Sequence, residues 1–409
     1  MSWASTGSER DRWRAISCAD GREPGATAPL LRSPNNRCAQ RARRMVHPTQ
    51  VRLRGGPGFA VDMRAAVITA WGAPLVVQDI DPPRAGPGEV LVRLRVSGVC
   101  HSDVHEWKGD WPGERAVMQA RGIRVIGHEG VGTVEAVGAG VTRLSAGDRA
   151  GIPWMNSWCG RCEVCLTGYA QWCPNGQTTS VTVNGTFAEM ATVSERAAVS
   201  IPASIPDDEA APLMCAGVTA YGAIRRLVSE LRIPPGKIVA IVGAAGGLGH
   251  YAVQIARAMG YRVAGIDVGE ERVRFVRDLG AEWALDAKEA KQAIRSLGGA
   301  DAAIVFTPKL AGYELALKLT RLTGGVVAVG IPDPKEGPLP ITPSALINHG
   351  TRIVPTSVGV THEFDELFQL YTAGKVKGHL ARRGSLSDLT SILQEMADAR
   401  YLARAVVTI

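Results

Sequence analysis

The sequence predicts an α/β protein with more than one domain, one of them built on a doubly wound parallel sheet. The chain has 409 residues, more than a single hydrophobic core usually organises. From Lys237 onward, apolar runs typical of buried strands alternate with segments of helical periodicity. A glycine-rich turn joins the first of these strands to the helix that follows it. These observations predict a dinucleotide-binding domain over residues 216–355.

The predicted parallel domain has six strands. Its opening stretch, "KIVAIVGAAGGLGHYAVQIARAMGYRVAGID", is typical of a strand, a turn, a helix and a second strand. The other four predicted strands lie in "EWALDA", "DAAIVF", "GGVVAVG" and "TRIVPTSV". We expect a first domain over residues 63–215, and we expect residues 356–409 to return to it after the sixth strand.

The first 62 residues form a basic leader that differs from the rest of the chain. They hold eleven arginines, no lysine and five acidic residues, which gives +6 of the chain's net charge of +7. Their Pro, Gly and Ser content without apolar periodicity predicts disorder. An organelle transit peptide is one interpretation, although four of the acidic residues count against it: Glu9, Asp11, Asp20 and Glu23. We favour a non-functional extension, because an alternating strand pattern begins at Met63.

The charge and hydropathy patterns argue against nucleic acid and membrane as partners. The remainder of the chain is nearly neutral, which argues against nucleic-acid binding. No stretch approaches the ~20 apolar residues of a membrane-spanning helix, and the N-terminus lacks a secretory signal. We therefore expect a cytoplasmic protein with no membrane partner.

Four cysteines form a C-x2-C-x2-C-x7-C pattern in "CGRCEVCLTGYAQWC": Cys159, Cys162, Cys165 and Cys173. Reducing compartments disfavour disulfides, so four thiols this close indicate a metal site. Zn²⁺ accepts four thiolates in a closed tetrahedral site that orders a loop. An iron–sulfur cluster is the competing interpretation, which the absence of ferredoxin-like flanking residues disfavours.

The glycine-rich turn and the acid after the second strand predict NAD as cofactor. Backbone N–H groups at a helix N-terminus favour an anion such as a pyrophosphate. Asp267 would accept hydrogen bonds from the ribose hydroxyls and repel a 2′-phosphate, which favours NAD over NADP. Arg272 would contact the adenosine side, with an exposed helix charge as the alternative. At the turn itself we expect contacts from Gly243, Gly246, Gly247, Leu248 and Gly249.

Five motifs in order carry a family resemblance: "SGVCHSDVHEWKGDWP", "GHEGVGTVEAVG", "GDRAGIPWMNSWCGRCEVCLTGYAQWC", "LMCAGVTAYGA" and "GAAGGLG". From Met63 to Ile409 the chain resembles the zinc-containing medium-chain alcohol dehydrogenases, close to their microbial tetrameric ethanol dehydrogenase branch. The resemblance implies a GroES-like β-rich catalytic domain interrupted by a Rossmann domain. It also implies two Zn²⁺ per chain and a homotetramer.

The resemblance implies a catalytic zinc held by Cys100, His128 and Cys215. Two thiolates and an imidazole leave a fourth position open, as catalytic zinc sites do. Glu129 resembles the carboxylate that approaches the metal during ligand exchange. Asp103 would hydrogen-bond the far nitrogen of His128 and fix the imidazole.

The other positions carried over from the family concern proton transfer, cofactor contact and substrate. Ser102 and His105 resemble the proton relay, and His101 a residue that contacts the pyrophosphate. Trp111 and Trp154 match tryptophans that narrow the pocket for short primary alcohols, with hydrophobic packing as their alternative interpretation. After the "AVG" strand end, Val329 and Ile331 would border the nicotinamide.

The implied reaction is the reversible oxidation of a short primary alcohol to an aldehyde by hydride transfer to NAD⁺. The alternatives are the same chemistry on a secondary, polyol or aromatic alcohol, or a catalytically silent zinc-binding relative.

The chain departs from the family pattern at two places. The segment from Trp111 to His128 is about five residues longer than usual, which predicts an altered pocket rim or a displaced His128. Val360 and Thr361 stand where we expect the relatives' pyrophosphate-binding arginine, which predicts a lost charge-assisted contact.

Overall fold

The computed structural model describes residues 62–409. The predicted leader, apart from Asp62, lies outside the described residues. Within the described part, no helix is both long enough and apolar enough to cross a membrane.

Six parallel strands form one sheet in the order β12-β11-β10-β13-β14-β15. Their bounds are β10 Ile238–Val242, β11 Arg262–Asp267, β12 Trp283–Asp286, β13 Ala300–Val305, β14 Thr320–Ala328 and β15 Arg352–Pro355. The strand order reverses between β10 and β13, and the crevice beside this switch point is where doubly wound sheets bind dinucleotides. Four of the six strands fall within the predicted runs, whereas β13 begins one residue before its run and β14 begins four residues before its run. The prediction of a doubly wound parallel sheet is confirmed.

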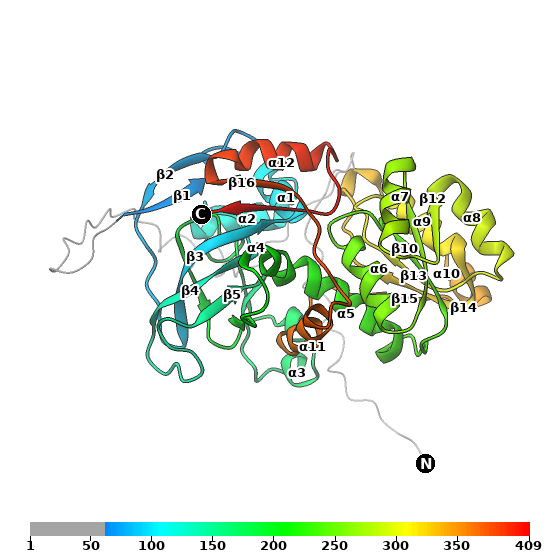
Figure 1. Cartoon of the computed structure of the whole chain (residues 1–409), viewed down its shortest axis with the longest axis horizontal. Coiled ribbons are helices and arrows are strands. Elements are labelled where there is room, and N and C mark those ends of the chain that lie inside the picture. Colours follow the sequence, from blue (N-terminus) through cyan, green and yellow to red (C-terminus); the bar gives the residue numbers. More distant parts are fainter. Residues whose placement is uncertain (1–61) are drawn as a thin grey trace, which may run out of the picture. The chain divides into compact units, whose positions relative to one another are not determined.

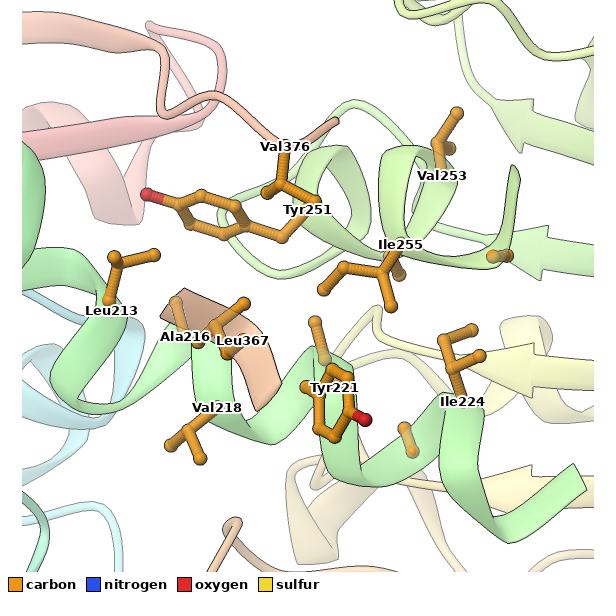
Figure 2. Packing of buried hydrophobic residues seen from close by; sticks show 14 of the residues in the cluster. Leu213, Ala216, Val218, Tyr221, Ile224, Tyr251, Val253, Ile255, Leu367 and Val376 are labelled. Atoms are coloured by element: carbon orange, nitrogen blue, oxygen red, sulfur yellow. The ribbon is translucent and has the colours of Figure 1, made fainter. Parts of the chain in front are cut away.

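Both faces of this sheet are covered by helices (Figure 1). These are α5 Ala216–Ser229, α6 Gly249–Ala258, α7 Glu270–Asp278, α8 Ala287–Ser296, α9 Leu310–Leu319 and α10 Pro343–His349. Along β10, Val239 and Ile241 pack into one apolar cluster and Ile238, Ala240 and Val242 into another, because successive strand residues point to opposite faces. In the first cluster α5 packs against α6, and Figure 2 shows Tyr221 and Ile224 of α5 near Ile255 of α6.

The other large sheet has seven strands, of which six run in the order β16-β17-β3-β4-β5-β9 and β8 pairs with β3. The bounds are β3 Glu89–Val99, β4 Gly130–Val137, β5 Arg149–Ile152, β8 Met190–Ser194, β9 Val199–Ser200, β16 Leu380–Ser385 and β17 Arg404–Thr408. The last strand returns to the first half of the chain, since Ala405 of β17 pairs with Val99 of β3. The helix before it, α12 Leu389–Ala397, packs against α1 His101–Lys108 (Figure 1).

The remaining elements are mostly short, apart from α2 and α11, and α11 packs against α5. They are β1 Met63–Val67, β2 Val76–Ile80, α2 Pro112–Arg121, β6 Met155–Ser157, α3 Glu163–Leu166, β7 Gln177–Thr178, α4 Asp207–Ala210 and α11 Thr361–Thr372.

The ends of three elements position the site. β3 ends at Val99 and α1 starts at His101, so Cys100 lies at the junction. His128 lies two residues before β4, and Cys215 directly precedes α5. The lengthened segment before His128 forms the helix α2. It begins with Pro112 at its first position and ends before Gly122, which has the left-handed conformation (φ 69°).

Candidate active site and metal centres

The predicted catalytic ligands meet in one buried cluster. Cys100, His128, Glu129 and Cys215 each place a ligand atom so that all four atoms lie within 4.8 Å of one another. His128 and Glu129 are fully buried, and the thiols are nearly so. His128 Nε2 finds no hydrogen-bond partner among the described residues, an orphaned buried atom that a metal would satisfy. This donor set fits Zn²⁺, and the longer approach to His128 does not keep it from the cluster.

Asp103 supports two members of this cluster from the first turn of α1. Its Oδ1 lies 2.9 Å from His128 Nδ1. Its Oδ2 accepts a 2.7 Å hydrogen bond from the backbone N–H of Cys100. The carboxylate therefore fixes the imidazole so that Nε2 faces the thiols. The hydrogen bond from the Cys215 thiol and the contact with His128 hold the pKa of Cys100 well below its usual value despite burial, which favours the thiolate.

Glu129 is tied to an arginine that lies 275 residues further along the chain. The Arg404 guanidinium donates to Glu129 Oε2, and Glu129 Oε1 accepts a 3.2 Å bond from the Ala216 N–H. Arg404 is only 2% exposed, so this ion pair is desolvated. Burial raises the pKa of Glu129 to about 8, although Arg404 opposes the shift. The pair connects the metal cluster to the C-terminal strand β17.

The two predicted relay residues lie on α1. Ser102 Oγ is 3.9 Å from Cys100 Sγ, which places the hydroxyl beside the metal cluster. His105 Nδ1 lies 3.4 Å from Asp110 Oδ2. Burial lowers the pKa of His105, and Asp110 opposes this shift. The sequence interpretation missed Asp110, although its place five residues after His105 was a usable signal.

The two predicted pocket tryptophans each contact a site histidine. The Trp111 ring stacks on His105 with centroids 4.6 Å apart and an interplanar angle of 21°. The Trp154 ring meets His128 edge to face at 4.6 Å. The two indole rings therefore reduce the free space beside His105 and His128.

The four loop cysteines form a second cluster, and their ligand atoms also lie within 4.8 Å of one another. The Sγ atoms of Cys159 and Cys165 are 3.9 Å apart, as are those of Cys162 and Cys173. A tetrahedron with Zn–S bonds of about 2.3 Å has edges of about 3.8 Å, so the loop fits a closed zinc site. All six described cysteines are free of disulfides, as such sites require.

A cavity of about 490 Å³ joins the glycine-rich turn to α1. Among the predicted cofactor contacts it is lined by His101, Gly243, Gly246, Gly247, Leu248, Gly249, Asp267 and Arg272, and His105 lines it too. Desolvation lowers the pKa of His101 to about 4, so its ring is neutral near pH 7. The cavity therefore has room and polar groups for a dinucleotide beside the relay histidine.

The turn needs glycine for steric reasons. Gly243 has φ 84°, in the left-handed region that disfavours side chains. A Cβ at Gly249 would lie 2.0 Å from the Gly243 carbonyl oxygen. Asp267 Oδ2 accepts a 2.8 Å bond from the Ala245 N–H, which holds the carboxylate at the turn. The arrangement leaves backbone open to the cavity, as a pyrophosphate requires.

Four residues that the sequence placed beside the cofactor do not line the cofactor cavity. Val329 and Ile331 follow β14 but do not line this cavity, and the Ile331 side chain is largely exposed. Val360 and Thr361 lie by the cysteine loop, in a cavity that includes Cys165. A basic group that does lie against the turn is Arg404, which lines the cofactor cavity and packs on Gly247. This position on β17 would allow a charge-assisted contact to a bound pyrophosphate, and the motif comparison along the chain missed it.

The sequence interpretation also missed two acids behind the site, the buried Glu106 and the half-buried Glu114. Glu106 accepts a 2.9 Å bond from Ser180 Oγ. Desolvation and the charge of Asp103 raise the pKa of Glu106 well above its usual value. Desolvation raises the pKa of Glu114, in the first turn of α2, to about 7.

The fold and these two clusters define a zinc-dependent oxidoreductase that uses a dinucleotide. Residues 86–203 match the alcohol dehydrogenase GroES-like domain family, and residues 247–373 match the zinc-binding dehydrogenase family. An alcohol dehydrogenase of Geobacillus stearothermophilus is 38% identical over 350 residues, which cover 85% of this chain and 100% of that protein. One from Schizosaccharomyces pombe is 42% identical over 275 residues, 66% of this chain and 76% of the relative.

Solved structures agree with these matches. The alcohol dehydrogenase of the archaeon Aeropyrum pernix superposes with a TM-score of 0.75 at 31% identity, over 85% of this chain and 100% of its own. A cobalt- and zinc-bound alcohol dehydrogenase of Pyrobaculum aerophilum gives a TM-score of 0.74 at 28% identity, over 85% of this chain and 100% of its own. The chain belongs to the zinc-containing medium-chain alcohol dehydrogenases and is an NAD-dependent zinc alcohol dehydrogenase. The predicted family, GroES-like and Rossmann fold, and cofactors are confirmed.

Proposed function

We propose that this enzyme oxidises short primary alcohols to aldehydes and catalyses the reverse reduction. The observation that carries the proposal is the placement of Trp111 and Trp154 against His105 and His128, because two large rings there leave little room for a long or branched substrate. When bound, zinc lowers the pKa of the alcohol hydroxyl, and NAD⁺ accepts the hydride.

The proposed roles of the chain's own residues follow from their positions. Cys100, His128 and Cys215 hold the catalytic zinc, with Glu129 close enough to approach the ion. Ser102 accepts the alcohol proton, and His105 passes it to solvent, because a neutral imidazole can take up a proton near pH 7. The loop cysteines hold the second zinc, which orders residues 159–173.

The proposed cofactor contacts lie along the cavity. The N–H groups of the turn at Gly247 and Leu248 bind the pyrophosphate, because the Gly246 N–H already donates to the Gly243 carbonyl. Arg404 is the cationic partner. Asp267 binds the adenosine ribose hydroxyls and disfavours NADP.

A second candidate is the same chemistry on larger or aromatic alcohols. Two solved structures of similar fold carry aromatic substrates in their names: a cinnamyl alcohol dehydrogenase of Sorghum bicolor and a reductase of the aromatic ketone acetophenone from Geotrichum candidum. Both are 27% identical to this chain, with TM-scores of 0.73. The pocket tryptophans favour the short alcohols over this candidate.

A panel of substrates separates the two candidates. We expect kcat/KM with NAD⁺ to fall about tenfold from ethanol to hexanol, and benzyl alcohol to be poorer still. Trp154→Ala should flatten this series, because it opens the space beside His128. Wild-type preference for benzyl alcohol, or for a secondary alcohol, would support the second candidate and contradict the first.

We further propose a cytoplasmic homotetramer. The free state of the six described cysteines supports a reducing compartment. Unpaired edge strand β15 and the exposed apolar side chains of Leu322, Ile347 and Ile353 support contacts between copies. Sedimentation at micromolar concentration tests the assembly, and a monomer would contradict it.

A further inference from the structure

His250, the second residue of α6, is a fully buried histidine with no role in the proposed chemistry. Its ring lies between two segments that are far apart in the sequence. Nδ1 is 3.1 Å from the Gly246 carbonyl oxygen, and Nε2 is 3.4 Å from the backbone nitrogen of His379. A backbone N–H only donates, so Nε2 must accept, and the ring proton must lie on Nδ1 and be donated to Gly246. The contacts thus select one neutral tautomer that bridges both segments.

The two bridged segments meet again at Arg404. Gly246 belongs to the turn that lines the cofactor cavity. The carbonyl of His379 accepts a 3.1 Å bond from the Arg404 N–H. The Arg404 guanidinium lies against the same turn, since a Cβ at Gly247 would be 2.9 Å from its Nη1. A closed ring of contacts therefore lies at the cavity wall. It runs from the turn through the His250 imidazole and the His379 backbone to Arg404, and from Arg404 back to the turn.

Other contacts keep these segments in register without touching Gly246. Gln254 Nε2 donates to the Lys377 carbonyl, and Gln254 Oε1 accepts from the Lys377 N–H, at 2.9 and 3.0 Å. The Ala403 N–H donates to the Ala245 carbonyl at 3.1 Å. Burial, with the nearby charges of His379 and Arg404, lowers the pKa of His250 to about 3, so the neutral bridge persists near pH 7.

We propose that His250 is a positioning residue for the dinucleotide: its neutral ring holds the Gly246–Gly247 turn at a fixed distance from Arg404. The turn's N–H groups and the guanidinium then reach the same pyrophosphate without rearrangement, which lowers the cost of binding. His250 contacts no reacting atom. The proposal rests on the proposed cofactor contacts of the turn and Arg404, and it is independent of which alcohol the enzyme prefers.

The test measures binding of dinucleotide fragments to the zinc-loaded full chain by calorimetry. His250→Leu removes both ends of the bridge, and His250→Asn keeps a donor near Gly246 but does not reach His379. For both variants we expect the Kd of ADP-ribose to rise about tenfold, with adenosine binding unchanged because adenosine lacks the pyrophosphate. The KM for NAD⁺ should rise in parallel, while kcat at saturating NAD⁺ and alcohol stays within about twofold.

Tyr251→Phe is the matched control. Tyr251 is the next residue of α6 and is equally buried, and its hydroxyl has no hydrogen-bond partner among the described residues. Figure 2 shows its ring beside Val376, just before the segment that His250 contacts. This variant should bind ADP-ribose as the wild type does. The proposal fails if both His250 variants keep ADP-ribose affinity within twofold of wild type, or if adenosine weakens as much as ADP-ribose. If His250→Leu does not fold, the ADP-ribose affinity of His250→Asn still tests the proposal, because that variant keeps a polar side chain at this position.

Discussion

The two cysteine-containing clusters are built in opposite ways. In the loop cluster all four cysteines lie between Cys159 and Cys173, and all are partly exposed. In the catalytic cluster, Cys100 and Cys215 come from distant parts of the chain and are buried with His128. The loop cluster needs only a short segment to bend, whereas the catalytic cluster needs three element junctions to meet.

This difference teaches what each cluster contributes. A local, closed four-thiolate site has no position for a substrate, so its metal contributes to folding of the loop. A site assembled from distant junctions depends on the completed fold and leaves a ligand position open. Loss of a single thiol should therefore lower the stability of the protein when the thiol belongs to the loop cluster, and should lower catalysis when it belongs to the catalytic cluster.

Cys100→Ser gives the largest expected effect. Replacing one ligand of the open site should lower kcat for ethanol oxidation by about a thousandfold or more, because the charge developing on the substrate oxygen loses its stabilisation. Zinc content should fall from two ions per chain towards one, and Tm should change little. Atomic absorption, steady-state NADH formation and thermal melting measure the three quantities. Retained turnover at wild-type level would show that Cys100 does not belong to the catalytic site.

Cys162→Ser applies the same chemical change to the loop cluster. Here we expect loss of the loop zinc, a Tm lowered by about 5 °C or more, and kcat within about tenfold of wild type at a temperature well below the melt. Cys100→Ser and Cys162→Ser are each the control for the other, because the same chemical change is made in both and the same kcat and Tm are measured. A loss of kcat as deep as that of Cys100→Ser, with Tm unchanged, would contradict the division between the two clusters.

The same contrast explains what could be predicted from the sequence. The spacing of the loop cysteines identifies their cluster without any fold, because all the ligands lie on one short segment. The central strands β10 and β13 of the parallel sheet were predictable because each is a buried apolar run. The catalytic ligands were found through the family resemblance, since no local spacing relates Cys100 to Cys215.

Contacts between distant segments set the limit of such prediction. Arg404 lies in an apolar strand, and only the pairing of β17 with β3 brings it to Glu129 and the glycine-rich turn. Sequence comparison along one segment placed the missing arginine at Val360 and Thr361, which lie by the cysteine loop instead. His250 stands within the recognised glycine motif, yet its partner His379 lies 129 residues away.

Asp110→Asn gives the smallest expected effect and tests a local pair inside the catalytic half. The carboxylate raises the pKa of His105 against the lowering caused by burial, so its removal lowers that pKa further. Alcohol oxidation needs neutral His105, and the rate therefore falls as pH drops through this pKa. The acid limb of kcat/KM for ethanol should move to lower pH, by less than about one unit because the Asp110 side chain is 40% exposed. Asp278→Asn, on α7, removes the same charge from an exposed site and should leave the profile in place. A shift of the acid limb to higher pH in Asp110→Asn would mean that Asp110 does not stabilise the protonated imidazole.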